Sequence, residues 1–187
     1  QLGMDVLRPF HYKYYGRVGM QYEFNASVDF ASLILEGDYG WGNIEWNGHN
    51  AETGTNNSYT NKGQYFRIGL NYNLLKDTPD KSMAFLGFRY ARSFFKDHLD
   101  SKVLYHHSEK GDSLIQNGPP IDSKQDHVKA RWFEAVAGIR VKVWKLLYAG
   151  GTIRYKFGLR LDGNNTHAPY DILGWGLNND ASFGFNL

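Results

Sequence analysis

The feature of this sequence that most restricts its fold is an alternation of apolar and polar residues with a period of two. From Leu147 to Leu161, one set of alternate residues is mainly aliphatic or aromatic, and the other set carries Arg154, Lys156 and Arg160. A helix would scatter these charges around its circumference, whereas a strand keeps them on one face. The pattern therefore predicts a β-strand.

The same alternation recurs along the chain and predicts eight strands. They are expected at residues 3–6, 17–24, 33–41, 65–74, 84–91, 132–143, 147–161 and 174–187. The connections are short near 25–29, 75–82 and 144–147, and longer near 8–16, 44–60, 97–128 and 161–172. Short turns at one end and long loops at the other are typical of outer-membrane barrels. We expect an all-β fold and a single domain over 1–187. It would be an eight-stranded antiparallel up-and-down transmembrane β-barrel with four long extracellular loops and three short periplasmic turns.

Alternation does not decide which face is outside, because a soluble lipocalin-like barrel has the same period with its faces reversed. The strand lengths match the roughly 9–11 tilted residues that cross the hydrocarbon layer. Glycines fall mostly on the charged face, where a narrow interior is crowded. Aromatic residues, Trp175 among them, gather toward the strand ends as interfacial girdles do. These features favour an apolar face toward lipid, on which Arg92 is an exception.

The charged face would then line a lumen too narrow for an aqueous channel, so its side chains are expected to pair across it as a structural plug. The predicted ion-pair plug consists of Arg17, Glu23, Glu36, Asp38, Arg67, Arg89, Glu134, Arg140, Lys142, Arg154 and Lys156. Asp5, Arg160 and Asp180 are expected on the same face. A path for protons or ions is the alternative interpretation of these charges.

Composition excludes several classes of protein. A formal net charge of +2 provides no basic field for nucleic acid. The absence of cysteine rules out disulfides, thiolate metal sites and a cysteine nucleophile. No apolar run approaches the roughly 20 residues of a spanning helix. Because no signal peptide is visible at Gln1, we expect a mature or trimmed chain.

All seven histidines fall in the predicted long loops, and the third loop also carries several carboxylates. Such residues bind zinc or calcium, but their spacing matches no compact metal motif, so we expect solvated loops without a metal or cofactor. Ser93, Ser101 or Ser108 could be combined with His98 or His106 as the catalytic group of an outer-membrane lipid-modifying enzyme, similar to lipid A deacylases and acyltransferases. No flanking signature accompanies them.

Several short segments carry resemblances. The last strand, with Phe183, Phe185 and Leu187, resembles the C-terminal signal that the barrel-assembly machinery reads, although an aromatic residue is commoner at the last position. The segments 36–40, 63–69 and 85–91 resemble a family of small outer-membrane β-barrels of unknown function from the Bacteroidota. That resemblance implies an accessory subunit of a larger outer-membrane assembly, plausibly the barrel-assembly machinery itself.

A second resemblance concerns modification. Asp112-Ser113-Leu114 resembles the O-glycosylation sequon of Bacteroidota secreted proteins, which would put a glycan on Ser113.

The sequence therefore leads to one expected function and two alternatives. We expect a non-enzymatic barrel in the bacterial outer membrane that serves as an accessory or structural subunit. Its expected partners are other outer-membrane proteins and outer-membrane lipid, not nucleic acid. The alternatives are the lipid-modifying enzyme and a soluble lipocalin-like ligand-binding barrel.

Overall fold

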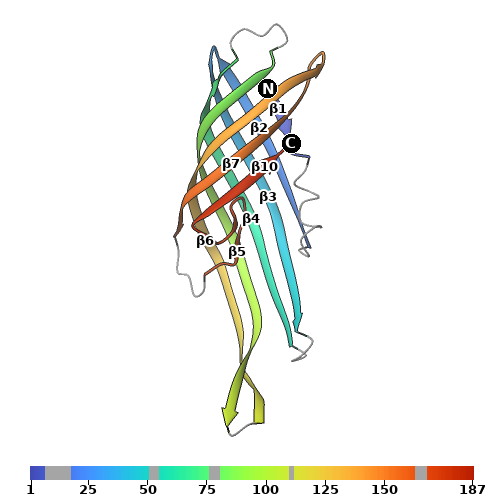
Figure 1. Ribbon diagram of the computed structural model, residues 1–187, viewed down its shortest axis with the longest axis vertical. Coiled ribbons are helices and arrows are strands. Elements are labelled where there is room, and N and C mark those ends of the chain that lie inside the picture. Colours follow the sequence, from blue (N-terminus) through green and yellow to red (C-terminus); the bar gives the residue numbers. More distant parts are fainter. Residues whose placement is uncertain (7–17, 51–54, 76–80, 110–111, 163–167) are drawn as a thin grey trace.

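The computed structural model is an all-β chain built around one large antiparallel sheet (Figure 1). It describes residues 1–6, 18–50, 55–75, 81–109, 112–162 and 168–187, and at 18, 49–50, 55–56, 102–109 and 112–120 it describes the backbone alone. The strands are β1 (Leu2–Met4), β2 (Val18–Phe30), β3 (Leu33–Asn50), β4 (Thr55–Asn73), β5 (Met83–Glu109), β6 (Asp112–Trp144), β7 (Leu147–Asp162), β8 (Asp171–Ile172), β9 (Gly176–Leu177) and β10 (Ala181–Asn186).

Eight strands form the large sheet in the order β1-β2-β3-β4-β5-β6-β7-β10, and every neighbouring pair is antiparallel. The predicted eight-stranded antiparallel meander is therefore confirmed. Within the described ranges, the edge strands β1 and β10 form no ladder with each other. One backbone hydrogen bond, from Val6 N–H to the Leu187 carbonyl (3.1 Å), joins the two ends of the chain.

The sheet is strongly curved, so that strands distant in its order bring their side chains together. Glu23 on β2 accepts hydrogen bonds from Arg154 on β7, although four strands lie between them in the sheet. This contact defines an inner face, and the opposite side of every strand forms an outer face. In Figure 1 the strands accordingly run side by side around a common interior.

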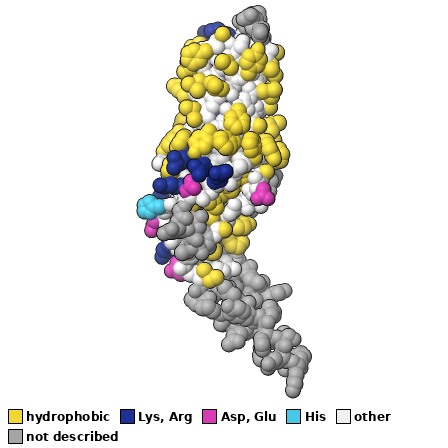
Figure 2. Space-filling view, turned by 90° about the vertical axis from the view of Figure 1, so that its left-hand side faces the viewer, with side chains coloured by type: hydrophobic (Ala, Val, Ile, Leu, Met, Phe, Trp, Pro, Cys, Tyr) yellow, Lys and Arg dark blue, Asp and Glu magenta, His cyan; other side chains and the backbone are white. Residues whose placement is uncertain are grey.

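On the turn side of the sheet, the distribution of side chains between the two faces is the reverse of that in a soluble protein. On β4, Arg67 and Asn71 are buried on the inner face, while Ile68, Leu70 and Tyr72 are exposed on the outer face. Figure 2 shows a broad band of apolar side chains over the outer face of the upper part of the molecule. The sequence alternation therefore separates a polar inner face from an apolar outer face.

Two of the predicted long loops are largely strand. β3 and β4 pair as far as Asn50 and Thr55, and β5 and β6 pair as far as Glu109 and Asp112. The expectation of long loops near 44–60 and 97–128 is therefore wrong for most of these residues. A backbone ladder continues after apolar alternation ends, because its hydrogen bonds do not depend on one face being apolar. The β5–β6 hairpin consequently projects far beyond the rest of the sheet (Figure 1).

The first turn also differs in position from the prediction. β2 continues to Phe30, and the chain reverses at Ala31 and Ser32 instead of near 25–29. Ala31 has a φ of 55°, which fits a tight two-residue reversal between antiparallel strands. The other short connections lie near 75–82 and at 145–146, as expected.

β7 contains a bulge that exchanges its faces. The pairing with β6 shifts between Arg131↔Arg160 and Phe133↔Phe157, and Gly158 within the shift has a φ of +69°. A bulge inserts one extra residue into a strand, so alternate side chains beyond it point to the opposite face. The prediction that Arg160 faces inward is therefore wrong: Arg160 is exposed, and Leu159 and Leu161 pack against the interior.

The last strand is shorter than predicted, because the segment before it folds inward. β10 begins at Ala181, whereas a strand was expected from Gly174. β8 and β9 form a small hairpin that places Ile172, Leu173 and Trp175 in the core. The expectation that Trp175 belongs to an outer aromatic girdle is therefore wrong. Asp180, expected on the inner face, is exposed.

In the part of the chain that the structure describes, no helix is long and apolar enough to cross a membrane.

Candidate functional site

The inner face holds a network of buried ion pairs centred on Glu23. Its carboxylate accepts hydrogen bonds from Arg67 Nη1 (2.6 Å), Arg154 Nη1 (3.1 Å), Asn186 Nδ2 (2.6 Å) and the Tyr65 hydroxyl. These donors come from β4, β7 and β10, while Glu23 lies on β2. One carboxylate therefore ties four strands together, and β2 and β4 lie in the opposite half of the sheet from β7 and β10.

Arg67 joins Glu23 to a second carboxylate. Its Nε donates to Glu134 Oε1 (2.9 Å), and its Nη2 donates to the carbonyl of Gly174 (3.0 Å). Glu134 also accepts a hydrogen bond from Trp132 Nε1 (2.7 Å). The side chains of Arg67, Glu23 and Glu134 are completely buried. Such charges are tolerated away from water only when each is paired and hydrogen-bonded.

The network continues toward the short turns through Arg89. Its guanidinium pairs with Asp38 and with Glu36, whose Oε2 lies 2.9 Å from Arg89 Nη2. Glu36 also accepts from Asn71 Nδ2 (2.6 Å), and Arg154 Nη2 lies 3.4 Å from Asp38 Oδ2. Acidic and basic side chains thus alternate across the interior, which holds the curved strands in one register.

The structure brings together seven residues of the predicted plug in one network, and an eighth, Lys156, is buried beside it. The clustered residues are Glu23, Glu36, Asp38, Arg67, Arg89, Glu134 and Arg154. Arg140 is half-buried at the turn end and donates to Gln1 Oε1. Lys142 is exposed, because it lies beyond the end of the β5–β6 ladder, whose last pair is Met83 with Arg140. Arg17 lies outside the described residues.

The inward hairpin of β8 and β9 fills the interior beside this network. Lys156 Nζ donates to the carbonyls of Gly174 (2.9 Å) and Trp175 (2.8 Å), and Asn61 Nδ2 donates to that of Asp171 (2.7 Å). The rings of Trp175 and Trp132 meet edge to face at 5.8 Å between centroids. Sequence reasoning missed this segment, although the run Ile172-Leu173 does not alternate as a half-buried strand would.

Glycine is required where the inward hairpin approaches the wall. Gly174 has a φ of +85°, and a Cβ there would lie 2.7 Å from the ring of Tyr65. Nearby, burial raises the pKa of the Tyr59 hydroxyl, which donates to the Asp171 carbonyl (3.0 Å). The hairpin is thus held by hydrogen bonds to its backbone carbonyls from side chains of β4 and β7, and it fits closely against the wall.

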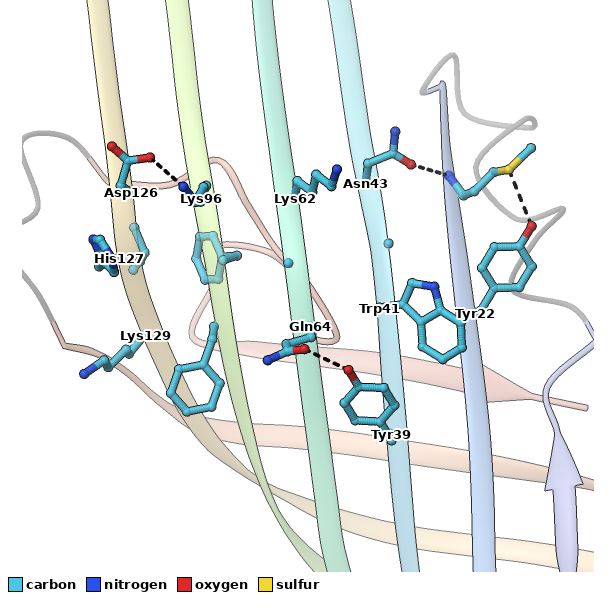
Figure 3. Close-up of a pocket in the computed structure, with 16 residues that line it drawn as sticks. Tyr22, Tyr39, Trp41, Asn43, Lys62, Gln64, Lys96, Asp126, His127 and Lys129 are labelled. Carbon is cyan, nitrogen blue, oxygen red and sulfur yellow. Dashed lines mark hydrogen bonds and ion pairs between the residues drawn. The ribbon is translucent and has the colours of Figure 1, made fainter.

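The outer face carries a shallow hollow of about 1240 Å³ across β2 to β6 (Figure 3). Aromatic side chains lie along its turn-side part, where the Tyr39 hydroxyl donates to Gln64 Oε1 (2.7 Å) beside Trp41. Charged side chains lie along its hairpin-side part, where Lys96 Nζ pairs with Asp126 Oδ1 at 3.1 Å. Sequence reasoning predicted no site here, because the hollow combines residues from five strands.

The residues considered for catalysis are used structurally where their side chains are described. Ser93 is buried and donates to the carbonyl of Gln64 (3.3 Å), and Ser101 donates to Asn57 Oδ1 (3.1 Å). His98 Nε2 lies 2.9 Å from Asp122 Oδ1 on an exposed surface. The side chains of Ser108, His106 and Ser113 lie outside the described residues. In the described part of the chain, no three His, Asp or Glu side chains are grouped to hold a metal ion.

The C-terminal residues proposed as an assembly signal lie on the outer face. Phe183, Phe185 and Leu187 are all exposed, and the ring of Phe183 lies tilted against Tyr155 of β7, with 5.2 Å between ring centroids. The last strand therefore presents its apolar side outward at one edge of the sheet.

Comparison with known proteins places the chain in a family without assigning it a role. No curated protein and no solved structure matches it. Residues 2–187 match a family model described as a domain of unknown function (DUF6048), which covers the whole sheet. The chain therefore belongs to the DUF6048 family.

Proposed function

We propose that the sheet closes into an eight-stranded barrel in the bacterial outer membrane and acts there as a non-enzymatic subunit of a larger assembly. The observation that carries the membrane part is a reversal of both faces at one level of the sheet. On β6, the outer face changes from Phe133 to Arg131, and the inner face changes from Glu134 to Trp132. The polarity of the strand thus reverses within two residues on both sides.

The neighbouring strands change at the same level. On β5, Tyr90 gives way to Arg92 outside and Arg89 to Ala91 inside. These positions are in register with β6, because Tyr90 pairs with Phe133 and Arg92 with Arg131. Toward the hairpin, the molecule has an apolar core and a polar surface, as proteins in water do. Toward the turns, it has a charged core and an apolar surface, which fits hydrocarbon.

The height of the apolar band also fits a membrane. On β4, the outward apolar residues run from Phe66 to Leu74, and on β6 from Phe133 to Val143. These stretches correspond to the roughly 9–11 tilted residues that cross the hydrocarbon layer as a strand. A lipocalin-like barrel in water would need its apolar face inside, which is the opposite arrangement.

A structural role, and not transport or catalysis, is supported by the way the interior is filled. Paired charges and the β8–β9 hairpin occupy the lumen, and eight strands leave little space for an aqueous path. The β5–β6 hairpin supplies a surface for partners. Among the described residues, neither strand pairs with a third strand beyond Asp100 on β5 and Lys129 on β6, and two-stranded ribbons are marginally stable in water by themselves.

The test is purification of the tagged full chain from membranes in mild detergent, followed by mass spectrometry of the proteins recovered with it. Stoichiometric recovery of other outer-membrane proteins is expected, and subunits of the barrel-assembly machinery would identify the assembly that the family resemblance suggests. Recovery of the barrel alone would refute the subunit role. Release of the protein by carbonate washing would refute membrane insertion.

A matched pair of variants tests the role of the hairpin. Ser101 and Ile121 are paired in register, so an Asn-Gly turn can replace residues 102–120 without changing the strands that remain. The control replaces 50–55 by the same turn between His49 and Asn56, which are also paired. We expect the first variant to lose its partners and the control to keep them, while both retain heat-modifiable mobility on gels.

Analysis of the cell's lipid A distinguishes the enzyme alternative from this proposal. Substituting each loop histidine with alanine and comparing lipid A by mass spectrometry should leave the lipid unchanged. A shift in acylation in any of these variants would favour the lipid-modifying enzyme instead.

A further inference from the structure

Three arginines lie side by side on the outer face of β5, β6 and β7. Arg92 is directly opposite Arg131, and Arg131 is directly opposite Arg160. All three point outward, and Arg160 does so only because of the bulge at Gly158. Like charges directly opposite each other on neighbouring strands destabilise a sheet. This arginine row (Arg92, Arg131 and Arg160) is therefore unfavourable for the isolated protein.

The described neighbours of the arginine row offset little of its charge. Arg131 Nε lies 3.5 Å from Asp162 Oδ2, and both side chains are nearly half exposed. The Arg92 guanidinium lies over the ring of Phe94, 5.1 Å from its centroid, and this uncharged ring does not neutralise its charge. Arg160 forms no ion pair with any other residue that the structure describes.

More basic residues lie on the hairpin side of the arginine row. Lys129 is directly opposite Phe94, one step beyond Arg92 and Arg131, and Lys96 is directly opposite Lys62. Asp126 offsets part of this charge through its exposed pair with Lys96. Figure 2 shows Lys and Arg side chains gathered along the lower border of the apolar band.

On the turn side, the arginine row borders a cluster of aromatic rings. Tyr90 is directly opposite Phe133, and Phe133 is directly opposite Phe157, one step closer to the short turns than the arginines. Phe133 contacts both rings and also stacks on Phe88, with a distance of 5.5 Å between centroids. The outer wall thus presents three cations in a line, followed directly by an apolar surface.

We infer that this surface binds a phosphorylated, acylated membrane lipid, with its phosphates on the arginine row and its acyl chains along the aromatic rings. Neighbouring strands are about 4.8 Å apart, so the three arginines span about 10 Å, enough to contact more than one phosphate. Guanidinium groups bind phosphate with paired N–H donors and suit this role better than lysine. Binding would also relieve the repulsion within the row.

The position of the row indicates which lipid it meets. This inference rests on the proposed membrane insertion, in which the long hairpin lies outside the cell and the short turns lie in the periplasm. The arginine row then lies at the headgroup level of the outer leaflet. A lipid A-type molecule, with phosphates on a sugar and several acyl chains, combines both of the required chemistries.

The test measures lipid binding by native mass spectrometry of the full chain released from neutral detergent. The probes are bis-phosphorylated lipid A and the same lipid after removal of both phosphates. The variant R92Q/R131Q/R160Q removes the row, and K124Q/K142Q/K145Q removes the same net charge from exposed positions elsewhere on the chain. Heat-modifiable mobility and retention in carbonate-washed membranes verify that each variant folds and inserts.

We expect the row variant to bind bis-phosphorylated lipid A at least about tenfold more weakly than wild type, which corresponds to about 1.4 kcal/mol. The control variant should bind like wild type, and the dephosphorylated lipid should bind wild type weakly. Equal binding by the row variant, or equal binding of both lipids, would overturn the lipid site. Displacement of the lipid by excess inorganic phosphate would also overturn it, in favour of a soluble anion.

The outcomes for the two proposals can be distinguished. Wild-type protein that remains in washed membranes but does not discriminate between the lipids would overturn the lipid site alone. Wild-type protein that washes off the membrane would overturn the proposed function and the lipid site together.

Discussion

Replacement of Arg67 by methionine tests whether the buried ion pairs hold the sheet together. Arg67 donates to Glu23 (2.6 Å), Glu134 (2.9 Å) and the Gly174 carbonyl (3.0 Å). The side chains of Arg67, Glu23 and Glu134 are completely buried. Methionine fills much of the volume but supplies no donor. Two carboxylates and one carbonyl of the inward hairpin therefore lose a partner in a region without access to bulk water.

The expected loss of stability follows from the partners that remain. Glu23 keeps Arg154, Asn186 and Tyr65. Among the described residues, Glu134 keeps Trp132 as a close hydrogen-bond donor, with Arg154 Nε at 3.8 Å and the charge of Lys156 acting on it more weakly. Removing one partner of a buried pair typically costs about 3–5 kcal/mol, because a charge is left uncompensated. We expect Arg67→Met to lower the free energy of unfolding by this amount, a large part of the roughly 5–15 kcal/mol available to a folded domain.

The assay is urea unfolding of protein refolded into lipid vesicles, followed by tryptophan fluorescence. Lys96→Met is the control, because its pair with Asp126 is two-thirds exposed on both sides and should contribute at most about 1 kcal/mol. The double variant R67M/E134Q removes the stranded charge on Glu134 and should recover about 1–3 kcal/mol of the loss. An Arg67→Met protein as stable as Lys96→Met would refute the reasoning, since the carboxylates would then have to be solvated.

Three further substitutions test other parts of the structure. Leu70→Arg, in the middle of the outward apolar band on β4, should lower the free energy of unfolding in vesicles by about 2–4 kcal/mol. Gln64→Arg, beyond the band, should change it little. Equal effects of the two substitutions would contradict a hydrocarbon environment at Leu70. Trp175→Ala should cost about 3–5 kcal/mol in the same unfolding assay, because it empties the core of the inward hairpin. Gly69→Val should abolish the folded, heat-modifiable band on gels, since its Cβ would overlap the Phe88 carbonyl oxygen, while Gly151→Ala, with room for a Cβ, should fold normally.

The faces of most strands could be predicted from the sequence, because a strand alternates its side chains with a period of two and each long strand repeats the pattern several times. Glu23, Arg67 and Glu134 were expected inside for that reason alone, and the structure places them there. The pairing among them could not be predicted. It depends on how far each strand is shifted relative to its neighbours around the curved sheet, and the alternation does not encode that shift.

The inward hairpin could not be predicted for a different reason. Trp175 and Leu177 continue the odd-numbered apolar set of the last strand, so the period alone extends that strand too far toward the N-terminus. Gly174 and Gly176 are the local signal, since their φ values of +85° and +112° are incompatible with regular strand. Two glycines close together in a strand pattern can mark the end of the strand, and they can equally mark a face that points into a narrow interior.

The bulge at Gly158 determines the composition of both the inner and the outer face of the sheet. On β5 and β6, alternate residues keep facing the same side across the proposed membrane boundary, and the polarity of each face reverses because the residue types change. On β7, the odd-numbered residues remain apolar through Leu159 and Leu161. One inserted residue turns them from the outer face to the inner face. The same insertion adds two apolar side chains to the core on the hairpin side and brings Arg160 into line with Arg131. Because one extra residue exchanges every side chain beyond it, the apolar core on the hairpin side and the arginine row both depend on the bulge at this single glycine.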